Sequence, residues 1–77
     1  MKKTYGDVLS YVIDSFEKMV YQKVSPETPF WDLGMDSLDR VELTMKFERH
    51  FDISIADEEI AALNTPKDFA LLICDKL

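Results

Sequence analysis

The chain has 77 residues, of which 47% are hydrophobic and 31% are charged, with 15 acids against 9 bases and a net charge of −6. This apolar fraction suits a small packed core and excludes an intrinsically disordered chain, and the length predicts one domain over residues 1–77. Because the negative charge repels phosphate groups, we expect partners with basic patches, and neither nucleic acid nor membrane.

The single cysteine, Cys74, rules out an intramolecular disulfide. No apolar run approaches the roughly 20 residues that span a bilayer. The basic start of the chain, residues 1–4, leads into no long apolar segment, so no signal peptide is expected. These features predict a reduced, cytoplasmic protein, which we expect to be a monomer.

Apolar residues recur at steps of three and four from Tyr5 to Val20. This spacing predicts an amphipathic helix over residues 4–21 with one buried face, and Thr4 is its candidate N-cap. The next segment, residues 22–36, contains two prolines in turn-forming contexts, so we expect it to be the long connection of the fold.

Three apolar residues of this connection, Phe30, Trp31 and Leu33, are expected to anchor it to the body of the protein. For Trp31 the sequence leaves two interpretations open. It can be a core anchor, or it can be exposed and contact a partner, since an indole ring is apolar but carries a polar N–H.

The second helix is predicted over Ser37–Phe51. Gly34 can form the turn with positive φ before it, and either Asp36 or Ser37 can cap it. A serine at this end of a helix stands where the macrodipole favours a phosphate group. Arg40 projects near the core side of the helix, and we expect its side chain to extend outward to solvent.

On a helical wheel the apolar residues of the second helix form two stripes. One stripe is expected to enter the core and contains Leu43, Phe47 and Phe51. The other, which we call the exposed stripe, contains Leu38, Val41 and Met45. A helix in a small bundle needs one apolar face for the core, so the exposed stripe and its bordering acids predict a docking face.

The remaining segments predict one short helix and one longer helix. Asp57 is expected to cap the short helix, which runs to Leu63, whereas Thr65 and Pro66 mark the start of the last helix. The last helix is expected to bury apolar residues at Phe69, Leu72, Ile73 and Leu77. The predicted fold class is therefore all-α, a small bundle of three principal helices and one short helix.

A longer motif surrounds Ser37: Leu33-Gly34-Met35-Asp36-Ser37-Leu38-Asp39, followed by Val41-Glu42-Leu43 and Phe51. It resembles the attachment region of the freestanding acyl carrier proteins. The resemblance implies a 4′-phosphopantetheine arm on Ser37, donated by coenzyme A, and a role as a carrier of acyl thioesters in fatty-acid or polyketide-type biosynthesis. It implies a carrier and not an enzyme.

The resemblance also implies partners and further site residues. The partners would be a phosphopantetheinyl transferase, an acyltransferase and a ketosynthase with basic patches. The docking residues would be Asp36, Leu38, Asp39, Val41, Glu42, Met45 and Glu48. The acyl chain could fold back into a pocket lined by Thr44, Phe47, Ile55, Ile60, Leu63 and Phe69. The second helix and the short helix would flank this pocket.

Other chemistry fits the sequence less well. The only histidine, His50, lies 13 residues beyond Ser37 on one helix, about 20 Å along its axis, so a serine hydrolase is disfavoured and His50 is expected at the surface. The acids from Asp52 to Glu59 lack calcium-loop spacing, so no dedicated metal site is expected. Cys74 is expected to be a core thiol.

Two alternatives to an acyl carrier remain open. A carrier of aminoacyl or aryl groups would share the fold and the arm, although Asp39 and the Glu42-Leu43 pair favour the acyl type. An unmodified carrier-like adaptor would use Ser37 only as a helix cap, a role that serine fills in many proteins.

Overall fold

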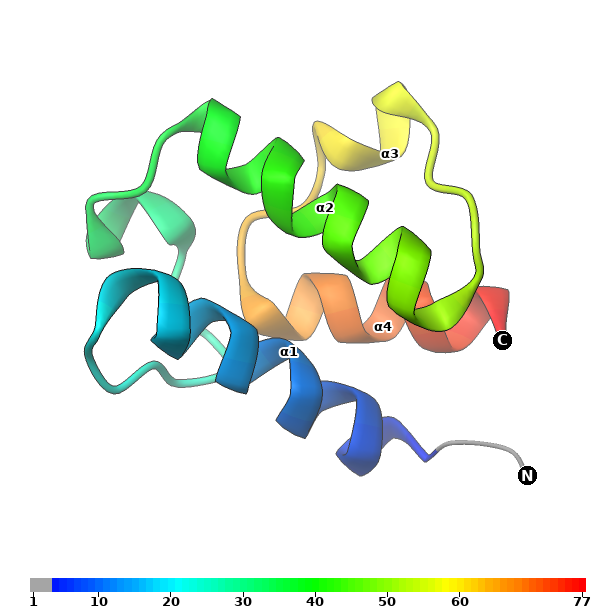
Figure 1. Ribbon diagram of the computed structural model, residues 1–77, viewed down its shortest axis with the longest axis horizontal. Coiled ribbons are helices and arrows are strands. Elements are labelled where there is room, and N and C mark those ends of the chain that lie inside the picture. Colours follow the sequence, from blue (N-terminus) through cyan, green and yellow to red (C-terminus); the bar gives the residue numbers. More distant parts are fainter. Residues whose placement is uncertain (1–3) are drawn as a thin grey trace.

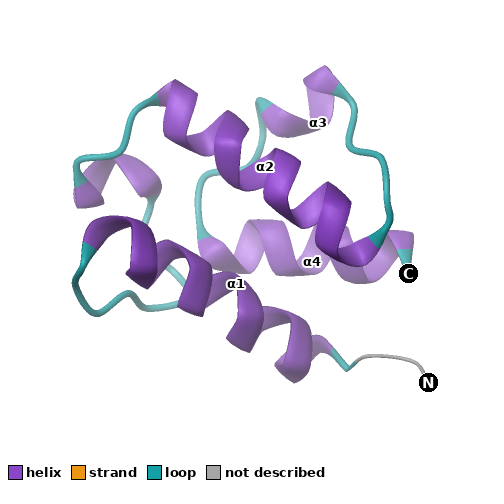
Figure 2. Cartoon of the chain, viewed as in Figure 1, coloured by secondary structure: helices purple, strands orange, loops and turns teal. Residues whose placement is uncertain are grey.

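Four α-helices carry the fold, and a 3₁₀ turn lies within the first connection (Figures 1 and 2). The computed structural model describes residues 4–77, so the basic start predicted not to be a signal peptide lies largely outside the described residues. The elements are α1 (Tyr5–Val20), η1 (Phe30–Leu33), α2 (Ser37–Phe51), α3 (Asp57–Ile60) and α4 (Pro66–Lys76). Residues 4–77 contain no strand, and the prediction of an all-α bundle with three principal helices is confirmed.

The core forms where α1, α2 and α4 meet, with α1 and α4 packed side by side and α2 crossing them (Figure 1). Its centre is a row of three fully buried phenylalanines, one from each helix. The ring of Phe69 lies edge-to-face against Phe16 and Phe47, at centroid distances of 5.7 and 5.3 Å. Because one face of α2 fills this core, its opposite face is left to solvent.

Each principal helix begins with the same reciprocal cap. The N-cap side chain accepts a hydrogen bond from the backbone N–H three residues on, and the acid at that position accepts one from the N-cap N–H. This arrangement satisfies two N–H groups that the helix itself cannot. The pairs are Thr4 with Asp7, Asp36 with Asp39, and Thr65 with Asp68. The predictions of Thr4 and Thr65 as N-caps are confirmed.

The two helices α1 and α2 also end in the same way. In each, a glutamate of the last turn accepts a hydrogen bond from a backbone N–H seven residues further along. Glu17 accepts from Val24 and Glu48 from Ile55, both at 2.9 Å. The C-cap residue, which lies between the glutamate and the N–H donor, has a left-handed backbone conformation in both helices. Its φ is 55° at Tyr21 in α1 and 56° at Asp52 in α2. The carboxylates therefore fix the direction in which the chain leaves each helix.

The short helix differs from the prediction at both ends. Asp57 is its first residue rather than its cap, and the N-cap is Ala56, which has no side-chain acceptor. Glu59 compensates by accepting the Ala56 N–H at 2.9 Å. The helix ends at Ile60 instead of Leu63, because the following residues form tighter turns, with the Leu63 N–H bonded to the Ile60 carbonyl at 3.0 Å.

Two further predictions about burial are corrected or decided. Leu77 is 40% exposed and does not enter the core, because it follows the last turn of α4. Trp31 is 55% exposed, so of its two interpretations the structure excludes the core anchor, while Phe30 beside it is buried. Among the described residues, none of the helices is both long and apolar enough to cross a bilayer.

Candidate functional site

Ser37 is the first residue of α2, and its side chain is exposed. Of the two possible caps, the structure selects Asp36, whose Oδ1 accepts the N–H of Asp39 at 3.0 Å. In return, Oδ2 of Asp39 accepts the N–H of Asp36 at 3.1 Å. The hydroxyl of Ser37 is thus not needed for capping, and within residues 4–77 no hydrogen bond to it is recorded.

The turn before Ser37 is held by backbone hydrogen bonds. Gly34 adopts φ 77°, and its N–H donates to the carbonyls of Phe30 and Trp31. A Cβ added to Gly34 would meet no atom within 4 Å, so the glycine is needed for its left-handed backbone and not for space. The N–H of Phe30 donates to the carbonyl of Asn64 at 2.8 Å, which ties η1 to the connection before α4.

Two backbone N–H groups beside the Ser37 hydroxyl have no hydrogen-bond partner within residues 4–77. The first N–H groups of an α-helix have no partner within the helix. Here the cap uses those of Asp36 and Asp39, and Arg40 begins the helical pattern by donating to the Asp36 carbonyl at 3.2 Å. The N–H groups of Ser37 and Leu38 are left, and they lie at the positive end of a 15-residue helix. A phosphate ester on Ser37 would find donors at this end.

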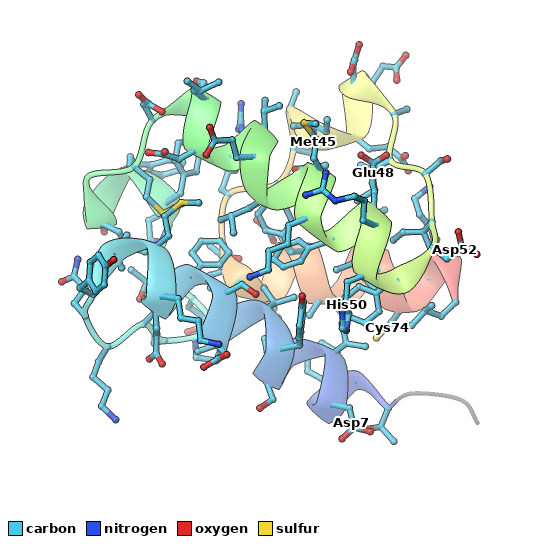
Figure 3. The ribbon with its side chains drawn as sticks, viewed as in Figure 1. Asp7, Met45, Glu48, His50, Asp52 and Cys74 are labelled. Atoms are coloured by element: carbon cyan, nitrogen blue, oxygen red, sulfur yellow. The ribbon has the colours of Figure 1, made fainter. Side chains whose placement is uncertain are left out.

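The two stripes of α2 are separated as predicted. Leu43, Phe47 and Phe51 are buried, whereas Leu38, Val41 and Met45 are 64%, 37% and 48% exposed. Figure 3 shows Met45 on the side of α2 away from α1. Glu42 borders this exposed stripe and is itself exposed. The structure thus presents an apolar surface with an acidic neighbour on the helix that begins at Ser37.

Three of the seven predicted docking residues also hold the fold together. Asp36 and Asp39 form the cap of α2, and Asp39 is half-buried. Glu48 is half-buried as well, and its Oε2 accepts the Ile55 N–H that fixes the exit from α2. Only one oxygen of each carboxylate is used in these bonds, so the other can still face a partner.

The six residues predicted to line an acyl pocket lie in the core at the junction of α2, α3 and α4. Thr44, Phe47 and Phe69 are fully buried, and the Thr44 hydroxyl donates to the Arg40 carbonyl at 2.9 Å. A shallow groove of about 440 Å³ lies nearby on α4, and of the six only Leu63 borders it. Its lining residues are Ala62, Leu63, Asp68, Leu71, Leu72 and Asp75. Of the other three predicted residues, Ile55 and Leu63 are buried and Ile60 is half-buried.

His50 and Cys74 lie away from Ser37. The His50 ring is stacked on Tyr11 of α1, with centroids 3.8 Å apart and planes within 10°, and in Figure 3 it projects from α2 towards α1. His50 is exposed, as predicted, and the stacked Tyr11 had not been identified from sequence. Cys74 is a half-buried free thiol packed against the core. Within residues 4–77 no three His, Cys, Asp or Glu side chains are placed to hold a metal ion.

Arg40 differs from its expected place. Its guanidinium lies 4.9 Å from the centroid of the Phe30 ring, and its Nε is buried without a hydrogen-bond partner among the described residues. The side chain therefore covers η1 instead of extending freely into solvent. The helical wheel placed Arg40 on the core side, but it gave no sign that Phe30, ten residues earlier, would lie beneath it.

Comparisons with known proteins agree on one family. Residues 10–73, which include Ser37, match a family described as a phosphopantetheine attachment site. An acyl carrier protein homolog of Mycoplasmopsis pulmonis is 36% identical over 69 residues, covering 90% of this chain and 94% of the relative. Chloroplastic acyl carrier proteins of Brassica campestris and Brassica napus are 50% identical over 52 residues.

The coverage of these relatives differs. The Brassica matches include 68% of this chain but only 39% of the plant proteins. The crystal structure of an acyl carrier protein from Thermotoga maritima superposes with a TM-score of 0.78 and 28% sequence identity, covering 94% of this chain and 88% of that one. Sequence and fold therefore point to the same family over most of this chain.

Proposed function

This chain belongs to the acyl carrier protein family, and we propose that Ser37 is the residue that carries its 4′-phosphopantetheine arm. Proteins of this family are carriers and not enzymes, and the family match implies an attachment site for phosphopantetheine. The observation that supports Ser37 is its place at the start of α2, exposed, with the capping performed by Asp36.

The attachment is a phosphoryl transfer in which Ser37 supplies the nucleophile. Its Oγ forms a bond to the β-phosphorus of coenzyme A, and the bond from that phosphorus to the oxygen of the departing adenosine bisphosphate breaks. The serine proton passes to a base of the transferase. His50 cannot accept it, because it lies 13 positions along α2, about 20 Å away.

The arm supplies a terminal thiol that holds acyl groups as thioesters, and the chain supplies its anchorage. The phosphodiester would carry one negative charge beside the free N–H groups of Ser37 and Leu38 at the helix N-terminus. The hydrogen-bonded turn at Gly34 and the cap at Asp36 hold the backbone on the N-terminal side of Ser37. We therefore assign these residues to positioning the attachment point.

The family works with biosynthetic enzymes, and we propose a phosphopantetheinyl transferase, an acyltransferase and a ketosynthase as the partners of this chain. The exposed stripe of α2, bordered by Glu42, would dock against an apolar patch rimmed by basic side chains. The net charge of −6 favours such partners. We further propose that residues 1–77 act as one carrier domain, with cargo of the fatty-acid or polyketide type.

For a bound acyl chain we propose the junction of α2, α3 and α4. Thr44, Phe47, Ile55, Ile60, Leu63 and Phe69 meet there. Because these side chains are buried or half-buried, we propose that α3 moves aside to admit the chain. α3 has a single turn and no fully buried residue, so it is the element held most weakly.

Attachment is tested by incubating the protein with coenzyme A and a broad-specificity phosphopantetheinyl transferase. Peptide mass spectrometry should find one phosphopantetheine on Ser37, and Ser37→Ala should remain unmodified. Folded wild-type protein that stays unmodified with several transferases would favour the adaptor alternative. Loading with amino acids or aryl acids by their activating enzymes, but not with fatty-acid or polyketide-type acyl groups, would favour a carrier of aminoacyl or aryl groups.

A further inference from the structure

Trp31 is the single tryptophan of the chain, and it is 55% exposed on η1. Isolated exposed apolar residues are common on soluble proteins, so exposure alone does not indicate a function. The position of Trp31 is a stronger indication than its exposure. Its backbone is hydrogen-bonded to Gly34, at the end of the molecule where α2 begins.

Three contacts keep η1 in place. The Trp31 carbonyl accepts the N–H of Gly34 at 3.2 Å. The buried ring of Phe30 lies edge-to-face against the Trp31 ring at a centroid distance of 5.2 Å. Arg40 of α2 then covers Phe30, at 4.9 Å, and leaves its own buried Nε without a partner among the described residues. With its backbone held and one contact from its ring to Phe30, the indole loses less conformational entropy than a free side chain would when a partner covers it.

Trp31 also lies close to the proposed attachment point. Ser37 follows Gly34 by three positions in the sequence, and three steps of an extended chain span at most about 11 Å. With the 3.2 Å bond from Gly34 to Trp31, the backbone of Trp31 is within about 15 Å of Ser37. A standard protein interface covers about 800 Å² on each partner, a disc of roughly 16 Å radius. An enzyme that binds Ser37 at the centre of an interface of this size would therefore also cover the position of Trp31.

The surroundings of Trp31 indicate the chemistry of that rim. Asp32 and Asp36 are both exposed, and neither takes part in an ion pair recorded within residues 4–77. An arginine or lysine on the partner could pair with these carboxylates and lie against the indole face. Tryptophan and arginine are also the residues most enriched at binding hot spots.

We propose that Trp31 is a binding residue for the transferase that modifies Ser37, contacting a basic side chain at the rim of its active site. This inference rests on the proposed function of Ser37. It assigns to Trp31 an effect on binding and none on the chemical step, because the indole is not needed to hold the Ser37 hydroxyl.

The first test compares loading kinetics of the wild type, Trp31→Ala and Tyr21→Ala with one phosphopantetheinyl transferase. Tyr21 is the matched control, since it is the other strongly exposed aromatic residue of the described chain, 91% exposed, and lies at the far end of the connection. Trp31→Ala should raise KM for the carrier about fivefold or more with kcat unchanged, and Tyr21→Ala should leave both unchanged.

The second test needs no truncation and therefore does not depend on how a variant folds. The single tryptophan is replaced by 5-fluorotryptophan, and its ¹⁹F resonance is followed as the transferase is added. A change in chemical shift that saturates with transferase supports the contact, and an unchanged chemical shift at saturation overturns it.

Failure of the proposed function of Ser37 can be distinguished from failure of the inference about Trp31. If wild-type protein is never loaded, the proposed function of Ser37 fails, and the inference about Trp31 falls with it. If the wild type is loaded and Trp31→Ala has an unchanged KM, only the inference fails. A lower kcat at unchanged KM would also overturn it, because Trp31 would then position the turn instead of binding the enzyme.

Discussion

Asp36 and Asp39 cap the start of α2 by mutual hydrogen bonds, each accepting the backbone N–H of the other, at 3.0 and 3.1 Å. The pair encloses Ser37 and Leu38, and the exposed hydroxyl of Ser37 takes no part in the cap. The helix end is thus stabilised by its neighbours while the serine stays free for modification. This separation between folding and attachment leads to the first two predictions.

Replacing Asp36 by alanine should remove the N-cap and lower the free energy of unfolding by about 1 kcal/mol, within the range of 0.5–2 kcal/mol typical of cap deletions. Asp36→Asn keeps a side-chain acceptor and should lose less. Urea denaturation of the two variants and the wild type measures the difference. Equal stability of Asp36→Ala and wild type would show that Ser37 takes over the cap.

Ser37→Ala should abolish loading while lowering stability by less than about 1 kcal/mol, because it alters an exposed residue outside the cap. Leu43→Ala on the same helix should lower stability by about 2–5 kcal/mol, because it truncates a buried side chain. Denaturation curves and mass spectrometry report the two effects separately. A Ser37→Ala protein as unstable as Leu43→Ala would mean that the serine is mainly structural.

Glu48→Ala should lower the free energy of unfolding by about 1–2 kcal/mol, because a charge-assisted hydrogen bond to Ile55 is lost. The Ile55 amide should exchange faster with solvent, as seen by hydrogen-exchange NMR. Glu17→Ala is the matched control, since it removes the equivalent bond to Val24. Unchanged stability and unchanged Ile55 exchange, with slower loading, would instead assign Glu48 to docking alone.

Glu42→Lys should change stability by no more than about half a kcal/mol, because the side chain is exposed. It should nevertheless slow association with a basic transferase, most strongly at low salt, since charge attraction is screened beyond about 8 Å at physiological ionic strength. Loading rates against carrier concentration at two salt levels test this. If Glu42→Lys is loaded at the wild-type rate at both salt levels, Glu42 is not part of the docking face.

Met45→Ala tests the apolar part of the same surface. Since Met45 is half exposed, truncation should leave the melting temperature close to that of the wild type. It should weaken transferase binding by a similar factor at low and high salt, because apolar contact and not charge is removed. A large drop in melting temperature would assign the exposed stripe to the core.

The pKa of Glu59 is lowered below its usual value of 4.5, first by the hydrogen bond from the Ala56 N–H and then by Lys76, whose Nζ lies 3.0 Å away. A carboxyl with a lowered pKa in the folded state contributes stability that is present above 4.5 and is lost as pH falls through the lower folded value. Glu59→Gln should therefore be less stable than the wild type at neutral pH, and the two free energies of unfolding should converge in acid. NMR titration of the carboxyl in Lys76→Met should show a pKa that is still lowered, though less than in the wild type, because the hydrogen bond from the Ala56 N–H remains.

The sequence by itself determined the main helices, the caps of α1 and α4 and the exposed stripe. These features depend on residues within a few positions of one another. Helical periodicity fixes which side chains share a face, and a threonine before a helix can reach only nearby N–H groups. For the same reason the expected bounds of α2, Ser37–Phe51, agree with the structure.

Only the tertiary structure decided how the segments that connect the helices pack against the rest of the protein. Arg40 covers Phe30 because η1 folds back against α2, and Phe30 is tied to Asn64 by a bond between segments 34 residues apart. The exposure of Trp31 follows from that packing, since burying Phe30 turns its neighbour towards solvent. No local pattern encodes such contacts, because they depend on how distant segments meet in space. Ser37 could be found from the sequence, whereas its surroundings required the fold.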